Sequence, residues 1–393
     1  MPTPMRILVA LSSREISDEL LRGIRIYQAE HPRLQLVLCV LEYASLHSRH
    51  LLRSSIARVR PDGVLAELFW PGARRDIAPG LPVVCVNCDF ARSSFPTVSL
   101  DQARIGVLAA EHMLAQDLPH YAFAAVTGYE YGAALRWRGF RDRLKRAGHT
   151  CHLIDDYIRK PVAQRLTDVG LRDWVAQLPT PIGIHAYFQT LAMRIIWACG
   201  EVGLRVPEDV AVIGGRDQPV MATDWTPTVS GVAINRSQVG FDGLRLLDGL
   251  LHGTRPPKRP VLVPPTEVVA RQSSDYRGMR DPEVARIRRA IAEGAYRPLV
   301  VKELLAHTRL SRRALERRFE RHMGHTLHDE IVAAHMQQAQ RLLRTTLLSP
   351  AEVARQSGYG GYAAFAVAFR RHTGLTATAW RRQAVTMTSP ACQ

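Results

Sequence analysis

The segment RFERHMGHT, Arg318–Thr326, recurs fifty residues later as AFRRHTGLT, Ala368–Thr376, and this repeat decides the fold of the C-terminal part. Five of the nine positions are identical: a phenylalanine, an arginine, a histidine, a glycine and a threonine. In both copies the preceding residues predict a short helix and a tight turn, and the repeated segment lies in a second helix. A helix, a short turn and a second helix form the helix-turn-helix motif. The sequence therefore predicts two helix-turn-helix units in tandem.

Each copy contains an apolar stripe that would fix the angle between its two helices. Such a stripe faces the neighbouring helix and leaves the outer face of the second helix for the major groove of DNA. The stripes are Leu304, Leu305, Leu310, Leu315 and Phe319 in the first copy and Val353, Ala354, Tyr359, Phe365 and Phe369 in the second copy.

The outer face of the second helix in the first copy is rich in arginine. Ser311 can cap this helix. Arginine suits DNA binding, because its guanidinium group reads guanine bidentately and also clamps phosphates. A solvated, arginine-rich surface helix is the alternative, but the repeat, the turn spacing and the basic surroundings favour DNA. The candidate DNA contacts of this copy are Ser311, Arg312, Arg313, Glu316, Arg317 and Arg321.

The charge distribution points to the same part of the chain. The 393 residues carry a formal net charge of +16. Residues 281–393 hold 18 Lys+Arg and 9 Asp+Glu, a net charge of +9, whereas the first 280 residues have a net charge of only +7. A basic region of this kind calls for a polyanionic partner, most often nucleic acid. The DNA contact is therefore expected in the C-terminal third.

The two copies together resemble the DNA-binding domain of AraC-type regulators. The matching residues are the Ala, Leu-Ser, Leu and Phe within Ala306–Phe319, then Ala339, Leu342 and Leu343, and the SGY, FxxxF and GxT patterns of the second copy. A long helix, expected at His328–Arg344, would join the two units. The resemblance implies that double-stranded DNA is the partner and that the protein contacts RNA polymerase.

The second copy departs from this family at the start of its second helix, GYAAFAVAF, Gly361–Phe369, which lacks small polar residues. We therefore expect the first unit to read bases and the second unit mainly to hold phosphates through Arg370 and Arg371. Gly361 and Tyr362, at the start of this helix, are further candidates for contact with DNA.

The first 270 residues alternate short β-rich runs with stretches of helical periodicity. This alternation favours parallel sheets built from βαβ units. The strands are too many for one small sheet, so we expect two lobes with a ligand between them, outside the carboxyl ends of the strands. The expected strands are Arg6–Leu11, Leu34–Leu41, Gly63–Leu68, Val83–Asn87, Ala122–Thr127, Ile182–Tyr187, Val210–Gly214 and Val261–Val263. The expected helices include Ser17–Gln28, Gln102–Ala115, Ala133–Ala147, Leu191–Gly203 and Ser237–Leu251.

Three segments of this part resemble the effector domains of lactose-repressor-type regulators: VSLDQARIGVLAAEHML at Val98–Leu114, RWRGF at Arg136–Phe140 and EVGLRVPEDVAVIG at Glu201–Gly214. The resemblance implies an α/β, two-lobed, periplasmic-binding-protein-like domain, followed here by the all-α C-terminal domain with its two helix-turn-helix units. That domain order resembles the family of bacterial xylose operon regulators along essentially the whole chain. It implies a cytoplasmic homodimer that responds to a sugar-type ligand and activates a sugar-utilisation operon.

The ligand residues that this resemblance implies are Arg136, which occupies the place of a hydroxyl-binding arginine, and Asp101, which matches an acidic residue near the cleft. Arg and Asp suit sugar hydroxyls, because charge-assisted hydrogen bonds offset the desolvation of several OH groups. For each of them a helix cap or a surface ion pair is the alternative reading. The remaining candidates are Ser12, Ser13, Phe188, Gln189 and Asp217.

Two positions differ from the sugar-sensing relatives. This chain has Phe188-Gln189 where the relatives carry Asn-Asp, and Arg216 where they carry an aspartate, with Asp217 one place later. Both differences remove strong hydroxyl partners. The two arginines Arg136 and Arg216 would suit an acidic sugar such as a uronate, which remains an alternative to a neutral sugar.

The junction of the two parts is expected near Asp281. A helix is predicted to begin there, because Asp281 can act as its N-cap, Pro282 takes the first helical position and Glu283 lies in the first turn. We therefore expect a ligand-binding domain at residues 1–274, a linker at 275–282, a DNA-binding domain at 283–386 and a tail at 387–393.

No catalytic, metal or cofactor motif is recognised, and no apolar run is long enough to span a membrane. A sugar-processing enzyme with a basic appendage and an architectural nucleic-acid binder are the alternative classes.

Overall fold

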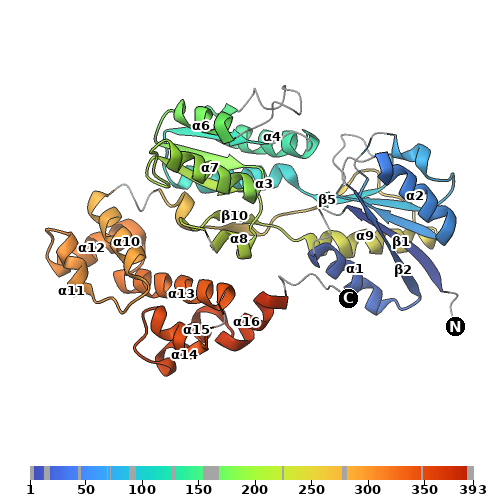
Figure 1. Cartoon of the computed structure of the whole chain (residues 1–393). Helices are drawn as coiled ribbons and strands as arrows, with labels where there is room; N and C mark the ends of the chain where they lie inside the picture. The colour runs from blue at the N-terminus through green and yellow to red at the C-terminus, as the bar shows by residue number, and fades with distance from the viewer. Residues whose placement is uncertain are drawn as a thin grey trace.

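The computed structural model describes residues 4–12, 18–42, 46–68, 70, 72–87, 94–125, 130–153, 168–223, 225–276, 281–346 and 348–386. Two α/β lobes and a helical C-terminal domain follow one another across the molecule (Figure 1). Among these residues no helix is long and apolar enough to cross a membrane.

Lobe 1 is an all-parallel, six-stranded sheet in the order β11-β5-β4-β3-β1-β2. Residues Ile7–Leu11 of β1 are buried on both faces, which explains the continuous apolar run of that strand. The strands are β1 Met5–Ser12, β2 Leu34–Leu41, β3 Gly63–Ala66, β4 Val83–Val86, β5 Thr97–Leu100 and β11 Val261–Val263. The helices of this lobe are α1 Asp18–Glu30, α2 Leu46–Val59 and α9 Arg236–Leu251, with a short 3₁₀ turn η1 at Ala73–Asp76.

Lobe 2 repeats this architecture with the order β12-β10-β9-β8-β6-β7, in which only β12 pairs antiparallel to its neighbour. The strands are β6 His120–Ala124, β7 His152–Leu153, β8 Ile182–Ala186, β9 Val210–Gly214, β10 Ser230–Ala233 and β12 Glu267–Val269. The helices are α3 Gln102–Ala115, α4 Glu130–Arg146, α6 Asp168–Ala176, α7 Gln189–Glu201 and α8 Pro219–Thr223. The 3₁₀ turn η3, Gln272–Ser274, follows β12.

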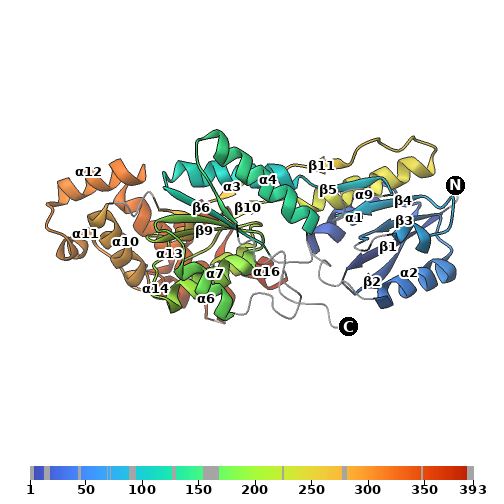
Figure 2. The same cartoon turned by 90° about the horizontal axis from the view of Figure 1, so that it is seen from above.

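The chain passes three times between the lobes: from β5 to α3, from β10 to α9 and from β11 to β12. Figure 2 shows the two sheets end to end, with these crossings in the middle. The two lobes are therefore joined by three connections. The prediction of a two-lobed α/β domain is confirmed.

The C-terminal domain is all-helical and has two apolar cores, one for each predicted unit. Its helices are α10 Pro282–Gly294, α11 Val301–Leu304, α12 Arg312–Met323, α13 Leu327–Thr345, α14 Pro350–Gln356, α15 Tyr362–Thr373 and α16 Ala377–Thr386, with the 3₁₀ turn η5 Leu305–His307 after α11. In both views it lies at the end of the molecule that carries lobe 2 (Figures 1 and 2).

The repeated sequence has the same structural role in both copies. Phe319 and Phe369 are fully buried in their respective cores. Gly324 and Gly374 end α12 and α15 with φ angles of 76° and 74°, in the left-handed region that glycine adopts without strain. Thr326 then caps α13 through a hydrogen bond from the Asp329 amide. Thr376 accepts a hydrogen bond from the Ala379 amide in the same way, so three of the five identical residues are the core contact, the turn and the cap of each unit.

Each expected strand and helix has a counterpart in the structure, but four short strands were not expected. The expected bounds of Leu34–Leu41, Val210–Gly214, Val261–Val263 and Gln102–Ala115 are those of the structure. The strand expected at Ala122–Thr127 lies at His120–Ala124, with residues 126 and 127 outside the described part. Strands β5, β7, β10 and β12, of two to four residues, were not expected, although β3, β4 and β11 are as short as some of them and were.

Candidate DNA-binding and ligand-binding sites

Helix α12 presents an arginine-rich face to solvent. The hydroxyl of Ser311 accepts a hydrogen bond from the Ala314 amide and caps the helix. Leu315 and Phe319 are fully buried on the inner face. The opposite face exposes the predicted DNA contacts Arg312, Arg313, Arg317 and Arg321.

One predicted contact residue is held by another on this face. Arg312 Nε donates to Glu316 Oε1 at 2.9 Å, one helical turn away, and both side chains are largely exposed. Glu316 therefore orients the Arg312 guanidinium along the outer surface of the helix. A carboxylate at this place can also accept a hydrogen bond from the exocyclic amine of cytosine.

Arg318 on the same helix points back to the protein. Its Nε donates to Asp281 Oδ2 at 2.6 Å, and His322 Nε2 lies 3.1 Å from the same oxygen. Asp281 is the N-cap of α10, where its side chain accepts hydrogen bonds from the Glu283 and Val284 amides. Burial alone would raise the pKa of Asp281, but the hydrogen bond from Arg318 and the amides lower it below its usual value. Arg318 thus stabilises the fold.

Helix α15 of the second unit exposes a different kind of surface. Its N-cap, Gly361, provides no side-chain cap. Tyr362 and Val367 are 46% and 72% exposed. Arg370 and Arg371 are exposed in the last turn. The predicted contacts of this unit therefore lie on one solvent-facing helix.

In lobe 2, Arg136 of α4 lies beyond the carboxyl ends of two neighbouring strands. Its Nη1 donates to the carbonyls of Tyr187, directly after β8, and Gly215, directly after β9, at 2.7 and 3.1 Å. Its Nε donates to Gln102 Oε1 at 3.0 Å, and its guanidinium carbon lies 4.2 Å from the centre of the Tyr187 ring. Arg136 is therefore fixed by neutral groups.

The charge of Arg136 is buried, and no carboxylate of the described residues pairs with it. The side chain is 4% exposed, and no ion pair between described residues includes it. Burial lowers the pKa of Arg136 to about 10, so the group stays cationic at neutral pH. The buried His185 nearby has its pKa lowered to about 3, by burial and then by the Arg136 charge, and is neutral.

In lobe 1, three polar residues meet at the carboxyl ends of neighbouring strands. The backbone amide of Ser12 donates to Glu67 Oε2 at 3.0 Å, and Asn87 Nδ2 donates to Glu67 Oε1 at 3.1 Å. Glu67 is 4% exposed and follows β3, and Asn87 follows β4. Ser12 was among the predicted ligand residues, whereas Glu67 and Asn87 were not. Ser13 lies outside the described residues.

The other predicted ligand residues already have structural partners. Asp101 caps α3 by accepting from the Arg104 amide at 2.9 Å, the alternative reading considered for it. Asp217 forms an ion pair of 2.7 Å with Arg271, and both side chains are largely buried. Phe188 packs edge-on against Tyr187 and precedes α7 as its N-cap.

Gln189 is 1% exposed, and its amide nitrogen donates to the Val229 carbonyl at 3.4 Å. Its Oε1 is buried and finds no hydrogen-bond partner among the described residues. A Cβ atom on Gly214 would lie 2.1 Å from this oxygen, so Gln189 packs tightly against β9.

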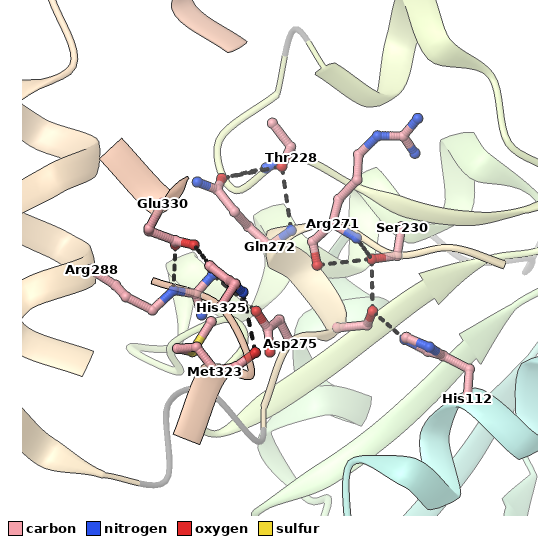
Figure 3. Close-up of polar contacts among 11 residues, drawn as sticks. His112, Thr228, Ser230, Arg271, Gln272, Asp275, Arg288, Met323, His325 and Glu330 are labelled. Carbon is pink, nitrogen blue, oxygen red and sulfur yellow. Dashed lines mark hydrogen bonds and ion pairs between the residues drawn. The ribbon is translucent and has the colours of Figure 1, made fainter. Parts of the chain in front are cut away.

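A polar network ties lobe 2 to the first helix-turn-helix unit (Figure 3). Arg288 of α10 donates to Asp275 Oδ2, beyond η3, at 3.0 Å and to Glu330 Oε1 of α13 at 2.8 Å. The Arg288 side chain is only 11% exposed. Burial alone would lower its pKa, but the two carboxylates raise it above the usual value. Glu330 also contacts His325 at 2.7 Å, so the network reaches the turn after α12.

The segment before Asp275 is bound tightly to lobe 2. The Gln272 side chain accepts from the Thr228 amide at 3.0 Å. Ser273 Oγ donates to the Val212 carbonyl of β9 at 2.7 Å. Ser274 Oγ donates to Ser230 Oγ of β10 at 2.7 Å and lies 2.6 Å from His112 Nε2 (Figure 3). Residues 272–274 are therefore held to the sheet of lobe 2 by hydrogen bonds.

Among the described residues, no group of three or more His, Cys, Asp or Glu side chains could hold a metal ion. Cys85 is a buried free cysteine, and Cys88 lies outside the described residues.

Comparison with known proteins supports both halves of this architecture. A periplasmic binding protein-like domain matches residues 110–274, and a helix-turn-helix domain matches residues 304–383. The xylose operon regulatory protein of Haemophilus influenzae is 25% identical over 334 residues, which span 83% of this chain and 86% of that protein. The protein of the same name from Escherichia coli K12 is 32% identical over 211 residues, 54% of each chain.

A solved structure has the same fold along nearly the whole chain. The structure of a xylose-binding transcription activator aligns with a TM-score of 0.67 and 24% identity, covering 97% of this chain and 99% of that one. The relatives are transcription regulators, so the enzyme alternative is set aside. The chain is a ligand-responsive transcription regulator, similar to the xylose operon regulatory proteins, in which a periplasmic binding protein-like domain precedes a C-terminal helix-turn-helix DNA-binding domain.

Proposed function

We propose that this regulator binds a sugar between its two lobes, binds double-stranded DNA through both helix-turn-helix units, and activates genes for sugar utilisation. The observation that carries the DNA-binding part is the arginine face of α12, exposed opposite the fully buried Leu315 and Phe319. We assign base reading to Arg312, Arg313, Glu316 and Arg317, with Ser311 as the helix cap. Arg321, Arg370 and Arg371 hold phosphates, and Gly361 and Tyr362 face the groove.

The ligand site that we propose lies between the carboxyl ends of the strands in the two lobes. Lobe 1 contributes Ser12 with Glu67 and Asn87, and lobe 2 contributes Arg136 and Phe188. Charged donors and acceptors beside an aromatic ring suit a sugar, whose hydroxyl groups need hydrogen bonds and whose ring carbons need an apolar surface. D-Xylose is the first ligand to test, because the relatives are named as xylose operon regulators.

An anionic sugar is the second candidate. Arg136 keeps a buried positive charge that pairs with no carboxylate among the described residues, and a buried charge is costly unless it is paired. A uronate or aldonate carboxylate would supply that partner. Asp217 does not compete for it, because its carboxylate is paired with Arg271.

The response to the ligand is proposed to pass through residues 271–275. Arg136 contacts the carbonyl of Gly215, and Asp217 follows two residues later. The carboxylate of Asp217 pairs with Arg271, which begins the segment that ends at Asp275. Asp275 in turn holds Arg288 of the DNA-binding domain. A ligand that repositions the end of β9 would therefore change the position of α10. The ligand can shift the equilibrium between two positions of α10 only if it binds the protein more tightly in one of them than in the other.

We infer that the regulator works as a homodimer. Leu38 and Val40, on the same face of the edge strand β2, are 49% and 42% exposed. On lobe 2, Trp197 is 43% exposed and lines a surface pocket of about 370 Å³ with Met193 and Trp225. Exposed apolar side chains of this size mark interaction surfaces.

Further assignments follow from the family resemblance. Activation implies contact with RNA polymerase, and DNA as the target places the protein in the cytoplasm. We assign residues 1–274 to the ligand domain, 275–282 to the linker, 283–386 to DNA binding and 387–393 to a tail.

A thermal-shift screen of the purified chain against pentoses, hexoses and uronic acids tests the ligand proposal. A ligand at one hundred times its dissociation constant stabilises the native state by about 2.7 kcal/mol, which is a measurable shift. A shift with xylose supports the neutral-sugar proposal, and a shift only with uronates supports the anionic one. No shift with any member of the panel would contradict both.

A further inference from the structure

The solvent-facing side of α15 carries no polar side chain over its first two turns except the Tyr362 hydroxyl. Tyr362, Ala363, Ala364 and Val367 are all exposed. Val367, at 72%, is more exposed than any other large apolar side chain that the structure describes. The apolar core of this unit does not need these residues, because Phe365 and Phe369 on the opposite side of the helix fill it.

The fifty-residue repeat shows which positions of the two recognition helices correspond. Arg313 and Arg317 of α12 take the places of Ala363 and Val367 of α15. In the first unit these positions hold guanidinium groups that suit guanine and phosphate. In the second unit the same positions hold small apolar groups. The two helices are therefore built to face different chemistry.

The major groove contains one apolar group, the C5-methyl of thymine, and alanine-sized side chains contact it directly. The neighbouring charges fit this occupant, because the exposed Arg370 and Arg371 in the last turn of α15 can hold the phosphates beside the groove. We propose that α15 recognises thymine through its C5-methyl groups, with Val367 and Ala363 as the methyl contacts. This adds base reading to the phosphate-holding role expected for the second unit.

The operator that follows from this assignment has two unlike halves. Arg313 and Arg317 select guanine in one half, and Ala363 and Val367 select thymine in the other. Recognition helices in successive turns of the major groove would place the two halves about 10 bp apart. The inference rests on the proposed DNA binding by both units.

The test compares thymine with uracil, which differ only by the C5-methyl group. A duplex selected from a random library by the full-length protein is resynthesised with deoxyuridine at each thymine in turn, and its Kd is measured by fluorescence anisotropy. Loss of one buried methyl contact should weaken binding about three- to fivefold. We expect this loss at one to three thymines in one half of the site and no loss at thymines elsewhere.

Two variants assign the effect to α15. In Val367→Ala the penalty of uracil at the thymine next to residue 367 should shrink, because alanine lacks the two γ-methyl groups of valine, whereas Arg317→Ala should leave that penalty unchanged. Val367 is exposed, so the variant should keep its melting temperature. Uniform insensitivity to uracil, or an undiminished penalty in Val367→Ala, would overturn the thymine assignment. So would unchanged DNA binding of Val367→Ala accompanied by a changed oligomeric state, which would make this face a protein contact.

If the protein did not bind DNA specifically, the same experiment would give a different result. In that case the library selection yields no preferred sequence, and the wild-type chain binds selected and scrambled duplexes with equal affinity. A preferred sequence whose affinity does not depend on any thymine methyl refutes only the role of α15.

Discussion

Arg288 of the DNA-binding domain and Asp275 of the ligand-binding part lie 3.0 Å apart in a largely buried ion pair. The same guanidinium holds Glu330 at 2.8 Å, so one side chain joins the end of η3 to two helices of the first unit. This arrangement makes Arg288 the residue through which we propose that ligand binding and DNA binding are coupled.

Replacing Arg288 with glutamine should uncouple the ligand from DNA. Breaking a buried pair by removing one partner costs about 3–5 kcal/mol, because Asp275 and Glu330 lose their counter-charge. We expect Arg288→Gln to bind ligand normally while its DNA affinity no longer changes with ligand. Anisotropy titrations with and without ligand measure this.

Arg289 provides the control, since it is exposed and lies 3.6 Å from Glu208. The Arg289 side chain is 53% exposed and meets Glu208 at a longer distance than Arg288 meets its two partners, so Arg289→Gln should disturb the contact less and keep the ligand response. A full ligand response in Arg288→Gln would show that the coupling runs elsewhere.

Two neighbouring arginines on α12 should respond in opposite ways. Arg317→Ala removes a group from the solvent-facing side and should cost about 1–3 kcal/mol in specific DNA binding if it reads a base. Arg318→Ala removes the hydrogen bond to Asp281 and should lower the melting temperature with little change in sequence preference. Equal effects of both variants on specificity would contradict the assigned orientation.

Arg136→Lys should weaken ligand binding at least tenfold. Lysine keeps the charge but cannot reproduce the fork that reaches Gln102, Tyr187 and Gly215 together. Calorimetric titration with the best ligand of the screen measures the loss. Arg138, exposed on the same helix, is the matched control, and Arg138→Lys should bind as the wild type does. An unaltered Kd for Arg136→Lys would remove Arg136 from the site.

Stability should fall in acid through the DNA-binding domain. Burial alone would raise the pKa of Glu330, but the charge of Arg288 and hydrogen bonds from Arg288 and His325 lower it, and the pKa of Asp281 is lowered too. A carboxyl group whose pKa is lower in the folded state than in the unfolded state stabilises the folded state. This stabilisation is fully present above the unfolded-state pKa of about 4, and it is lost as the pH falls through the folded-state pKa. Urea unfolding between pH 2 and 7 measures this loss.

Glu330→Gln should flatten the acid dependence, because the glutamine does not titrate. The same variant should be less stable than the wild type at pH 7, where the carboxylate is charged. A slope between pH 4 and 2 that is identical in both proteins would exclude Glu330 as a source of the acid sensitivity.

The helical domain was predictable from sequence because its signals are local. Asp281 and Pro282 mark the start of α10, and Gly324 and Gly374 mark the ends of α12 and α15. Each of these residues lies within one turn of the helix end that it indicates. Caps and turns need no knowledge of the rest of the fold. The same holds for the arginine face of α12, which follows from helical spacing alone.

The polar contacts around the proposed ligand site were less predictable, because the residues that form them are far apart in the sequence. Glu67 meets Ser12 across 55 residues, and Arg271 meets Asp217 across 54. Asp101 could be read as a ligand contact or as a cap, and only the structure places its carboxylate on the Arg104 amide. Such pairings depend on strand order, which a single sequence does not encode locally.

Ligand-responsive, sequence-specific DNA binding is tested most directly by measuring the affinity of the full-length protein for its selected duplex, at physiological salt, with and without ligand. We predict binding at least 10³-fold tighter than to a scrambled duplex, the usual range for specific recognition, and a shift in that affinity on adding the ligand found in the thermal screen. Equal affinity for both duplexes, unchanged by ligand, would contradict the conclusion that this chain is a ligand-responsive regulator.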